Sequence, residues 1–280
     1  MIKSNQYTTT PTTTPTTTTT TTTPTTNTST KMYYNYYIHG AMSGMFGIIL
    51  SHPIDTIKTH IQTGNKINTF TPSFKNFYKG ISSPLLGVGI EKALVFGTYH
   101  YMVSKTDNIP LSGALAGLTA SIIVTPYERL KIVKQNGLNI SRKDINVKFL
   151  FRGLSATFTR EVPGFAIYFT TYEYLKYNTF TKYNKKINYS SSFIFGGISG
   201  IVSWVFIYPQ DKIKTILQSS IDDTNYTKKI KIKTIINNIY KSGGIKQFYS
   251  GFTWALYRAT LLHSGTFLMM EYLTNTYYTN

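Results

Sequence analysis

The sequence predicts an all-α membrane protein in which three tandem repeats supply six transmembrane helices. Three observations lead to this prediction. One motif recurs three times in a fixed register, six segments are long enough to cross a bilayer, and most basic residues lie between those segments. An internal repeat of this kind decides the architecture before individual residues are considered.

The repeated motif joins a glycine-rich helix face to a proline and three polar residues. Its copies are residues 40–62, 113–135 and 196–218. In each copy two glycines precede the proline by thirteen and nine residues, and an acid, a lysine and a glutamine follow it by two, five and nine. Glycines four residues apart allow close approach of two helix backbones. The prolines Pro53, Pro126 and Pro209 each remove a helical hydrogen bond, so we expect kinks there.

Six segments can each cover a bilayer core of roughly 20 residues. They are 37–57, 82–103, 109–128, 155–178, 190–210 and 253–275. Glycines, serines, tyrosines and a few charges interrupt them, which indicates helices that line a polar interior. Between the members of each pair lies a shorter basic stretch that ends in an aromatic residue, one further residue and a glycine. We expect a short surface helix in each stretch, so that the unit is long helix, short helix, long helix.

The net charge of +18 is distributed along the chain in a way that favours a membrane protein. Nineteen of the 29 lysines and arginines lie in the windows 58–79, 129–152 and 212–246. Charge that recurs after each odd-numbered segment follows the positive-inside pattern and places both termini on the opposite side. A nucleic-acid partner is therefore not expected, although a basic chain invites that reading.

Composition also excludes several kinds of chemistry. The chain has no cysteine, and its five histidines are scattered, so we expect no metal site and no disulfide. It has no phosphate-binding glycine loop and no arrangement of nucleophile and base. We therefore expect no cofactor and no enzyme activity.

The chain divides into a tail and the three repeats. Residues 1–35 are expected to be a disordered, threonine-rich tail, because the tract 8–30 has no apolar residues to bury. A glycosylated stalk is the alternative, disfavoured because no apolar signal sequence precedes the tail. The repeats are expected at 36–106, 107–183 and 184–280.

The charges after each proline are candidates for a gate. They are Asp55, Lys58, Glu128, Lys131, Asp211 and Lys214. A charge at membrane depth is costly unless it is paired. Three acids and three bases around a bundle can pair between helices and close one mouth of a cavity, whereas solvated helix-end charges are the alternative. One turn further, Gln62, Gln135 and Gln218 could brace these pairs by hydrogen bonds.

The pattern Pro-x-acid-x-x-base, followed after a loop by aromatic-base-Gly, resembles the mitochondrial carrier family over residues 36–278. The resemblance implies six helices around a pseudo-threefold axis, three short matrix helices and a central substrate site. It also implies alternating access across the mitochondrial inner membrane, with both termini on the intermembrane-space side. We expect a monomer that binds cardiolipin near Gly80, Gly153 and Gly251, where helix N-termini suit an anionic headgroup.

A second motif of that family lies on the even-numbered helices and is poorly kept in this sequence. The motif is an aromatic residue, an acid, two further residues and a base. Only residues 172–176 match it completely, and there Glu173 and Lys176 would form a cytoplasmic gate. His100 replaces the acid in the first repeat, and Thr274 replaces the base in the third. This departure predicts a weak cytoplasmic gate and a carrier that rests open to the cytosol.

The candidate substrate site follows from counting into each even-numbered helix. Seven residues after the loop glycine come Gly87, Arg160 and Arg258, which resemble the central contact points of the family. Glu161 follows Arg160, and Glu91 lies one turn deeper than Gly87. Ionisable groups inside a membrane span are functional candidates. Arg160 would bind a carboxylate, Glu161 and Glu91 an ammonium, and Arg258 would complete the site or couple it to the gate.

These residues predict the substrate class. An arginine followed by an acid resembles carriers of amino acids and carnitine, and Glu91 resembles a position used by carriers of ornithine and other basic amino acids. We therefore expect exchange of an amino-acid-like substrate, with ornithine, arginine or lysine favoured. Residues 52–58 and 125–129 resemble carnitine/acylcarnitine carriers, which are the first alternative. A structural pairing of Arg160 with Glu161 or Glu91, and a non-transporting scaffold with a carrier fold, also remain open.

Overall fold

A computed structural model describes residues 26–62, 73–78, 80–135, 146–151, 153–219 and 232–278, and these residues form helices joined by short turns. The long helices are α1 (Thr26–Gln62), α3 (Ser82–Thr106), α4 (Ile109–Gln135), α6 (Leu154–Thr179), α7 (Tyr189–Ser219) and α9 (Phe252–Tyr278). The other helices are α2 (Phe74–Phe77), α5 (Val147–Leu150), α8 (Ile232–Phe248) and the 3₁₀ turn η3 (Thr181–Tyr183). The order long, short, long thus occurs three times.

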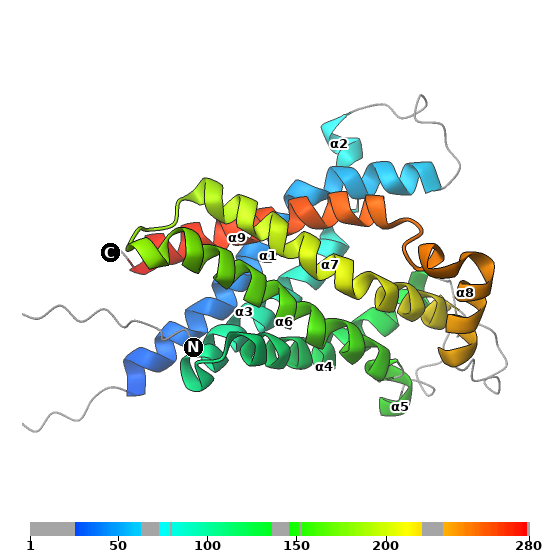
Figure 1. Cartoon of the computed structure of the whole chain (residues 1–280), viewed down its shortest axis with the longest axis horizontal. Coiled ribbons are helices and arrows are strands. Elements are labelled where there is room, and N and C mark those ends of the chain that lie inside the picture. The colour runs from blue at the N-terminus through cyan, green and yellow to red at the C-terminus, as the bar shows by residue number, and fades with distance from the viewer. Residues whose placement is uncertain are drawn as a thin grey trace, which may run out of the picture.

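The six long helices form a closed ring, because each packs against the next and α9 packs back onto α1. Figure 1 shows them side by side, with α5 and α8 at one end and the C-terminus at the other. We call these the loop end, where α2, α5 and α8 lie, and the terminal end, where α1, α4 and α7 begin and α3, α6 and α9 end.

Helix α1 begins at Thr26, within the range 1–35 that the sequence predicts to be disordered. Extending an existing helix adds one hydrogen bond for each residue fixed and needs no new nucleus, so a packed helix can continue into a polar sequence. The expected boundary at residue 36 therefore does not coincide with the start of the helix. Residues 1–25 lie outside the described part of the chain.

The glycine pairs have the packing role that the sequence predicts. A side-chain carbon added at Gly40 would lie 2.5 Å from the carbonyl oxygen of Lys92, and one at Gly117 would lie 2.4 Å from that of Glu161. At Gly196 the same carbon would lie 2.7 Å from the carbonyl oxygen of His263. In each repeat, therefore, the missing side chain lets the first long helix approach the backbone of the second.

The motif prolines lie inside α1, α4 and α7. In two repeats, the tyrosine of the aromatic-x-Gly turn bonds the carbonyl group that the proline leaves without its helical partner. The hydroxyl of Tyr78 donates to the carbonyl of Ile49 at 3.2 Å, and that of Tyr249 donates to the carbonyl of Val205 at 3.0 Å. Each carbonyl lies four residues before a proline, which has no N–H to bond it. The second repeat has Phe151 at the equivalent position, without a hydroxyl.

The loop glycines Gly80, Gly153 and Gly251 have φ angles of +82°, +98° and +84°. This left-handed region is disfavoured for residues with a side chain, which explains why glycine ends the aromatic-x-Gly turn. The turn reverses the chain directly into α3, α6 and α9. It therefore fixes where each second long helix enters the bundle.

An aromatic layer closes the interior towards the terminal end. It comprises Phe96, Tyr99, Phe165, Tyr168, Phe169, Tyr172 and Phe267, all buried. The rings of Tyr172 and Phe267 stack at 3.5 Å and those of Tyr99 and Phe169 at 3.7 Å, so α3, α6 and α9 meet at the centre of the bundle. The sequence predicts a carrier that rests open at this end, whereas in this structure the aromatic residues are packed together. Aromatic packing needs no complete set of ion pairs to close the helices together.

Among the described residues, two helices contain a stretch long and apolar enough to cross a membrane, at Ile109–Leu130 and Tyr189–Lys214. The sequence predicts six spans. The other four long helices have comparable length but a more polar sequence. Part of that polarity comes from charged residues that α3, α6 and α9 direct towards the interior, which lower the mean hydropathy of these helices.

Candidate functional site: a charged cavity inside the helix ring

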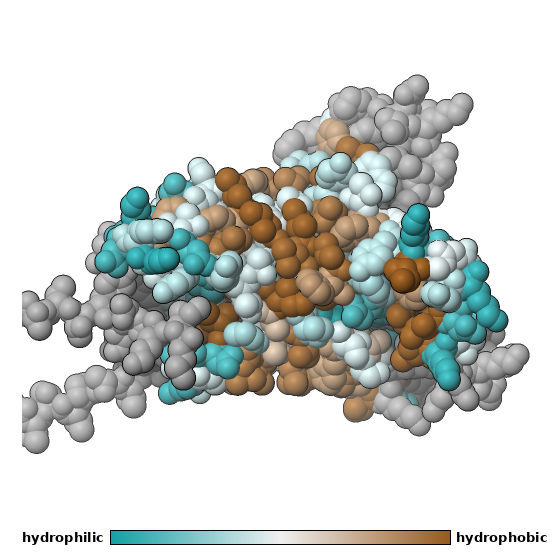
Figure 2. Space-filling view, in the orientation of Figure 1, coloured by the Kyte–Doolittle hydropathy of each residue, from teal (hydrophilic) through white to brown (hydrophobic). Residues whose placement is uncertain are grey.

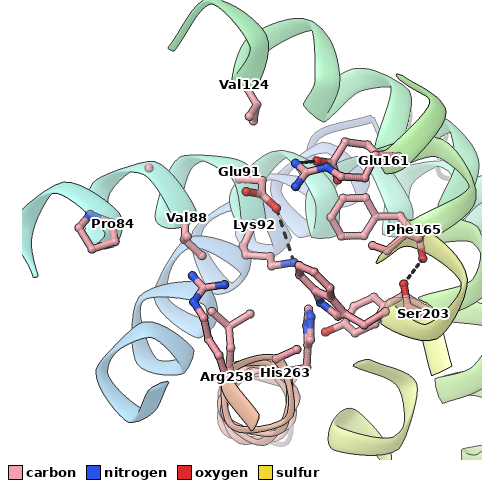
Figure 3. A pocket seen from close by; sticks show the side chains of 18 of the residues that line it. Pro84, Val88, Glu91, Lys92, Val124, Glu161, Phe165, Ser203, Arg258 and His263 are labelled. Atoms are coloured by element: carbon pink, nitrogen blue, oxygen red, sulfur yellow. Dashed lines mark hydrogen bonds and ion pairs between the residues drawn. The ribbon is translucent and has the colours of Figure 1, made fainter. Parts of the chain in front are cut away.

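A cavity of about 250 Å³ lies inside the ring, between the aromatic layer and the loop end. Residues from α3, α4, α6, α7 and α9 line it, and Figure 3 shows part of its wall. The five positions proposed for substrate binding, Gly87, Glu91, Arg160, Glu161 and Arg258, all line this cavity. Counting from the loop glycine thus brought together residues from three helices, whereas their contact with a substrate stays a prediction.

Arg160 is surrounded by carboxylates. Its guanidinium contacts the Glu161 carboxylate and lies 2.9 Å from Asp211 and 3.6 Å from Glu128. The Arg160–Glu161 pair that the sequence left open is therefore present. Asp211 and Glu128 belong to the predicted gate, so Arg160 connects the cavity wall to the gate charges.

Arg258 makes a parallel connection on the other side of the ring. Its Nε lies 2.7 Å from the carboxylate of Asp55, which joins α9 to α1. Like Arg160, this arginine lines the cavity and binds a gate acid. The geometry fits the second role considered for Arg258, in which it couples the central site to the gate.

One gate pair of the predicted kind is described. The ammonium of Lys214 lies 2.6 Å from a carboxylate oxygen of Glu128, which joins α7 to α4 at the loop end. The side chains of Lys58 and Lys131, and those of Gln62, Gln135 and Gln218, lie outside the described residues. The ring of three pairs and the glutamine braces therefore stay predictions.

The cavity wall nearest the terminal end contains a lysine, Lys92, to which the sequence analysis assigned no role. Lys92 is 2% exposed, and its ammonium lies 4.6 Å from the ring centre of Phe165 and 3.8 Å from the Glu91 carboxylate. Figure 3 shows Lys92 and His263 pointing towards the same part of the cavity. Counting seven residues from the loop glycine ends more than one turn before Lys92, and a count of twelve would have found both residues.

At the terminal end, Glu173 and Lys176 each contact another helix. Lys176 lies 3.5 Å from Glu271 of α9, and Glu173 lies near Tyr99 of α3. In the first repeat, His100 replaces the acid of the motif. Its ring stacks on that of Tyr36, with ring centres 3.8 Å apart. The incomplete motif thus contributes one interhelical ion pair among the described residues, alongside the aromatic layer.

Known proteins share this sequence pattern. A sequence model of the family described as "Mitochondrial carrier protein" matches residues 103–183 and 185–280. The chain is 31% identical to the mitochondrial magnesium exporter 1 of Drosophila melanogaster, over 85% of this chain and 93% of the relative. It is 28% identical to the mitochondrial ornithine transporter 1 of Saccharomyces cerevisiae, over 85% and 94%, and 28% identical to the mitochondrial carnitine carrier of the same yeast, over 84% and 85%. The chain therefore belongs to the mitochondrial carrier family.

Proposed function

We propose that this chain is a carrier of the mitochondrial inner membrane that exchanges an amino-acid-like substrate, with a basic amino acid such as ornithine, arginine or lysine favoured. The observation that carries the proposal is the cavity, which is lined by three acids and three cations. Its acids are Glu91, Glu128 and Glu161, and its cations are Lys92, Arg160 and Arg258. A substrate with both charges suits this lining.

The surface supports a membrane location with six spans, and the basic windows after the odd-numbered helices favour placing both termini on the intermembrane-space side. Figure 2 shows apolar residues gathered across the middle of the visible face and hydrophilic residues towards both ends. On α7 the outward residues Ile194, Ile198, Val205 and Phe206 are 37–60% exposed. An apolar band of this kind matches the bilayer core, and a lone monomer would bury it in lipid.

Contacts at both ends of the cavity support alternating access. The Lys214–Glu128 pair and the contacts of Arg160 and Arg258 hold the loop end, and the aromatic layer holds the terminal end. A substrate that competes for Arg160 or Arg258 would weaken their contacts with Asp211 and Asp55, so binding and opening of the loop end are coupled. Such coupling requires the substrate to bind differently in the two states. No catalytic step is part of this function.

Lipid binding belongs to the same proposal. The N-termini of α3, α6 and α9, at Gly80, Gly153 and Gly251, lie at the loop end beside the basic windows. Helix N-termini together with lysines and arginines suit the two phosphates of cardiolipin. Bound lipid there would support the turn into each second long helix.

Carnitine or acylcarnitine exchange is the second candidate, because aromatic side chains form part of the cavity wall. Tyr127, Phe165, Tyr168 and Trp204 line it. Aromatic faces attract quaternary ammonium groups, such as the trimethylammonium group of carnitine. The carnitine carrier of yeast is also among the relatives of similar identity.

The test is uptake into proteoliposomes with purified protein. We expect exchange of ornithine, arginine or lysine, and exchange of carnitine and acylcarnitines instead would favour the second candidate. Transport of neither group would leave a non-transporting scaffold as the better description. Arg160→Ala should abolish transport while leaving membrane insertion intact, because three carboxylates lose their shared cation. Normal transport by that variant would remove Arg160 from the site.

A further inference from the structure

Three buried polar side chains form a roof over the cavity, at its end nearest the terminal end, where the aromatic layer begins and to which Tyr168 itself belongs. They are Lys92 of α3, Tyr168 of α6 and His263 of α9, and all three line the cavity. Their exposed fractions are 2%, 1% and 8%. We call this group the polar roof. Each of the three helices that meet in the aromatic layer contributes one member.

The polar roof has unused hydrogen-bonding capacity. The Tyr168 hydroxyl and the Nδ1 atom of His263 have no hydrogen-bond partner among the described residues. The Lys92 ammonium has Glu91 at 3.8 Å, which is too long for a hydrogen bond. Buried polar groups in native proteins are nearly always bonded, so two unbonded groups beside a buried ammonium indicate a ligand.

The three groups also lie close to one another. The Lys92 ammonium is 5.4 Å from the ring centre of Tyr168, and the rings of Tyr168 and His263 have centres 4.7 Å apart. Together they present an ammonium, a hydroxyl and an imidazole around one point. An ammonium and a hydroxyl both donate hydrogen bonds, and the imidazole can do so at one nitrogen. Such a set fits a carboxylate, which accepts hydrogen bonds only.

The glycine motif makes room for two of these side chains. A carbon added at Gly44 would lie 2.6 Å from Cγ of Lys92, and one added at Gly200 would lie 2.5 Å from Cδ2 of His263. The second glycine of the motif therefore holds a polar side chain inside the bundle in repeats one and three. The positions of Lys92 and His263 are built into the packing.

The other cavity cations are already matched by acids. Arg160 contacts three carboxylates, and Arg258 contacts Asp55. A substrate carboxylate would have to displace these acids to bind either arginine. At Lys92 the substrate carboxylate would meet the Glu91 carboxylate, 3.8 Å from the ammonium, and the two unbonded polar groups of Tyr168 and His263.

From these observations we infer that Lys92, Tyr168 and His263 form the subsite for the carboxylate of the substrate, while Glu91 and the acids below it receive its cationic groups. This inference rests on the proposed function and refines it by moving the carboxylate from Arg160 to the polar roof. It also gives the substrate a direct effect on the aromatic layer. Lys92 and His263 lie four residues, about one helical turn, before Phe96 and Phe267 on the same helices.

The test compares substrates with their decarboxylated forms. Ornithine is paired with putrescine, and carnitine with β-methylcholine, as competitors of proteoliposome uptake. The wild-type protein should bind the carboxylated member of its pair at least about tenfold more tightly, as one charge-assisted hydrogen bond provides. Lys92→Met should remove most of this preference by weakening only the carboxylated member, and Lys92→Arg should retain part of it. The control is Lys105→Met, at an exposed position in the last turn of α3.

Melting of the purified, unliganded protein separates this subsite from a structural role. The emission of Trp204 and Trp254 can follow unfolding. Tyr168→Phe should leave the melting temperature unchanged, because its hydroxyl has no partner to lose, yet should reduce the preference for the carboxylate. Lys92→Met should not lower the melting temperature, because it replaces an incompletely paired buried charge with an apolar chain.

The possible failures are distinguishable. If the wild-type protein transports neither pair, the proposed function is wrong, and the melting temperature still tests the polar roof. A lower melting temperature for Lys92→Met would show that Lys92 stabilises the fold. An unchanged or higher melting temperature would support a lysine that binds a ligand. If transport occurs and Lys92→Met retains the full preference for the carboxylate, the subsite is wrong and the carrier function stands.

Discussion

Lys214 on α7 and Glu128 on α4 form an ion pair across the loop end, with 2.6 Å between the ammonium nitrogen and a carboxylate oxygen. The Lys214 side chain is 4% exposed, so its charge depends on Glu128 for compensation. Glu128 also lies 3.6 Å from Arg160, so the pair extends to the cavity wall. Opening of the loop end has to separate these charges.

Replacing Lys214 with methionine should therefore destabilise the closed loop end. Glu128 would keep only its longer contact with Arg160, and we expect a loss of about 1–3 kcal/mol, as for a buried group that loses a charged partner. The melting temperature should fall and exchange should slow. Lys186→Met, at an exposed position between α6 and α7, is the control and should leave both unchanged. Equal results for the two variants would show that the pair contributes nothing.

The aromatic layer gives a prediction for the opposite end. Phe267 is 4% exposed, stacks on Tyr172 and meets Phe96 edge to face at 5.7 Å. Phe267→Ala should lower stability by about 3–5 kcal/mol because it leaves a cavity between α3, α6 and α9. It should also increase the leak of preloaded substrate from proteoliposomes in the absence of external substrate.

Two variants control the experiment on Phe267. Phe267→Leu keeps much of the volume and should have an intermediate effect. Tyr272→Ala removes an aromatic ring that is 48% exposed on the same helix and should change neither stability nor leak strongly. A tight layer with normal exchange in Phe267→Ala would mean that the terminal end closes by other contacts.

Features that repeat within one helix could be predicted from the sequence. The 3.6-residue period fixes which residues share a face, so the glycine pairs and the cavity positions Gly87, Arg160 and Arg258 follow from counting. Kinks at the three motif prolines stay a prediction, although these prolines do lie inside long helices. The repeat boundaries, and the gate roles of Lys58 and Lys131, stay predictions.

Contacts between helices could not be predicted in the same way. The pairing of Arg160 with Asp211, and of Arg258 with Asp55, depends on how far each helix tilts and slides against its neighbour. The aromatic layer was missed because its members are spread over three helices and look like ordinary core residues singly. A structure is needed to show that they stack at one level.

Glu91 offers a direct test of the preference for a cationic substrate. Glu91→Gln keeps the shape of the side chain but removes an anion that lines the cavity. Uptake of ornithine and lysine should weaken by about tenfold, the loss expected for one charged partner, whereas the neutral analogue citrulline should be less affected. Glu91→Asp should retain the preference. An equal loss for both substrates would indicate that Glu91 serves mainly to hold Lys92.

The carbonyl groups that the motif prolines leave without an N–H partner allow a stabilising change. The carbonyl of Val205 is freed by Pro209 and bonded by the hydroxyl of Tyr249, whereas Phe151 has no hydroxyl for the equivalent carbonyl of Ile122. An unbonded carbonyl is costly against lipid. Phe151→Tyr should therefore raise the melting temperature and increase the free energy of unfolding by about 0.5–1.5 kcal/mol. Tyr249→Phe should lower both, by a similar amount. If Tyr249→Phe does not change the melting temperature, the hydroxyl contributes no stability, and the ring of the aromatic residue is what stabilises the turn. The phenylalanine at position 151 would then be as stabilising as a tyrosine.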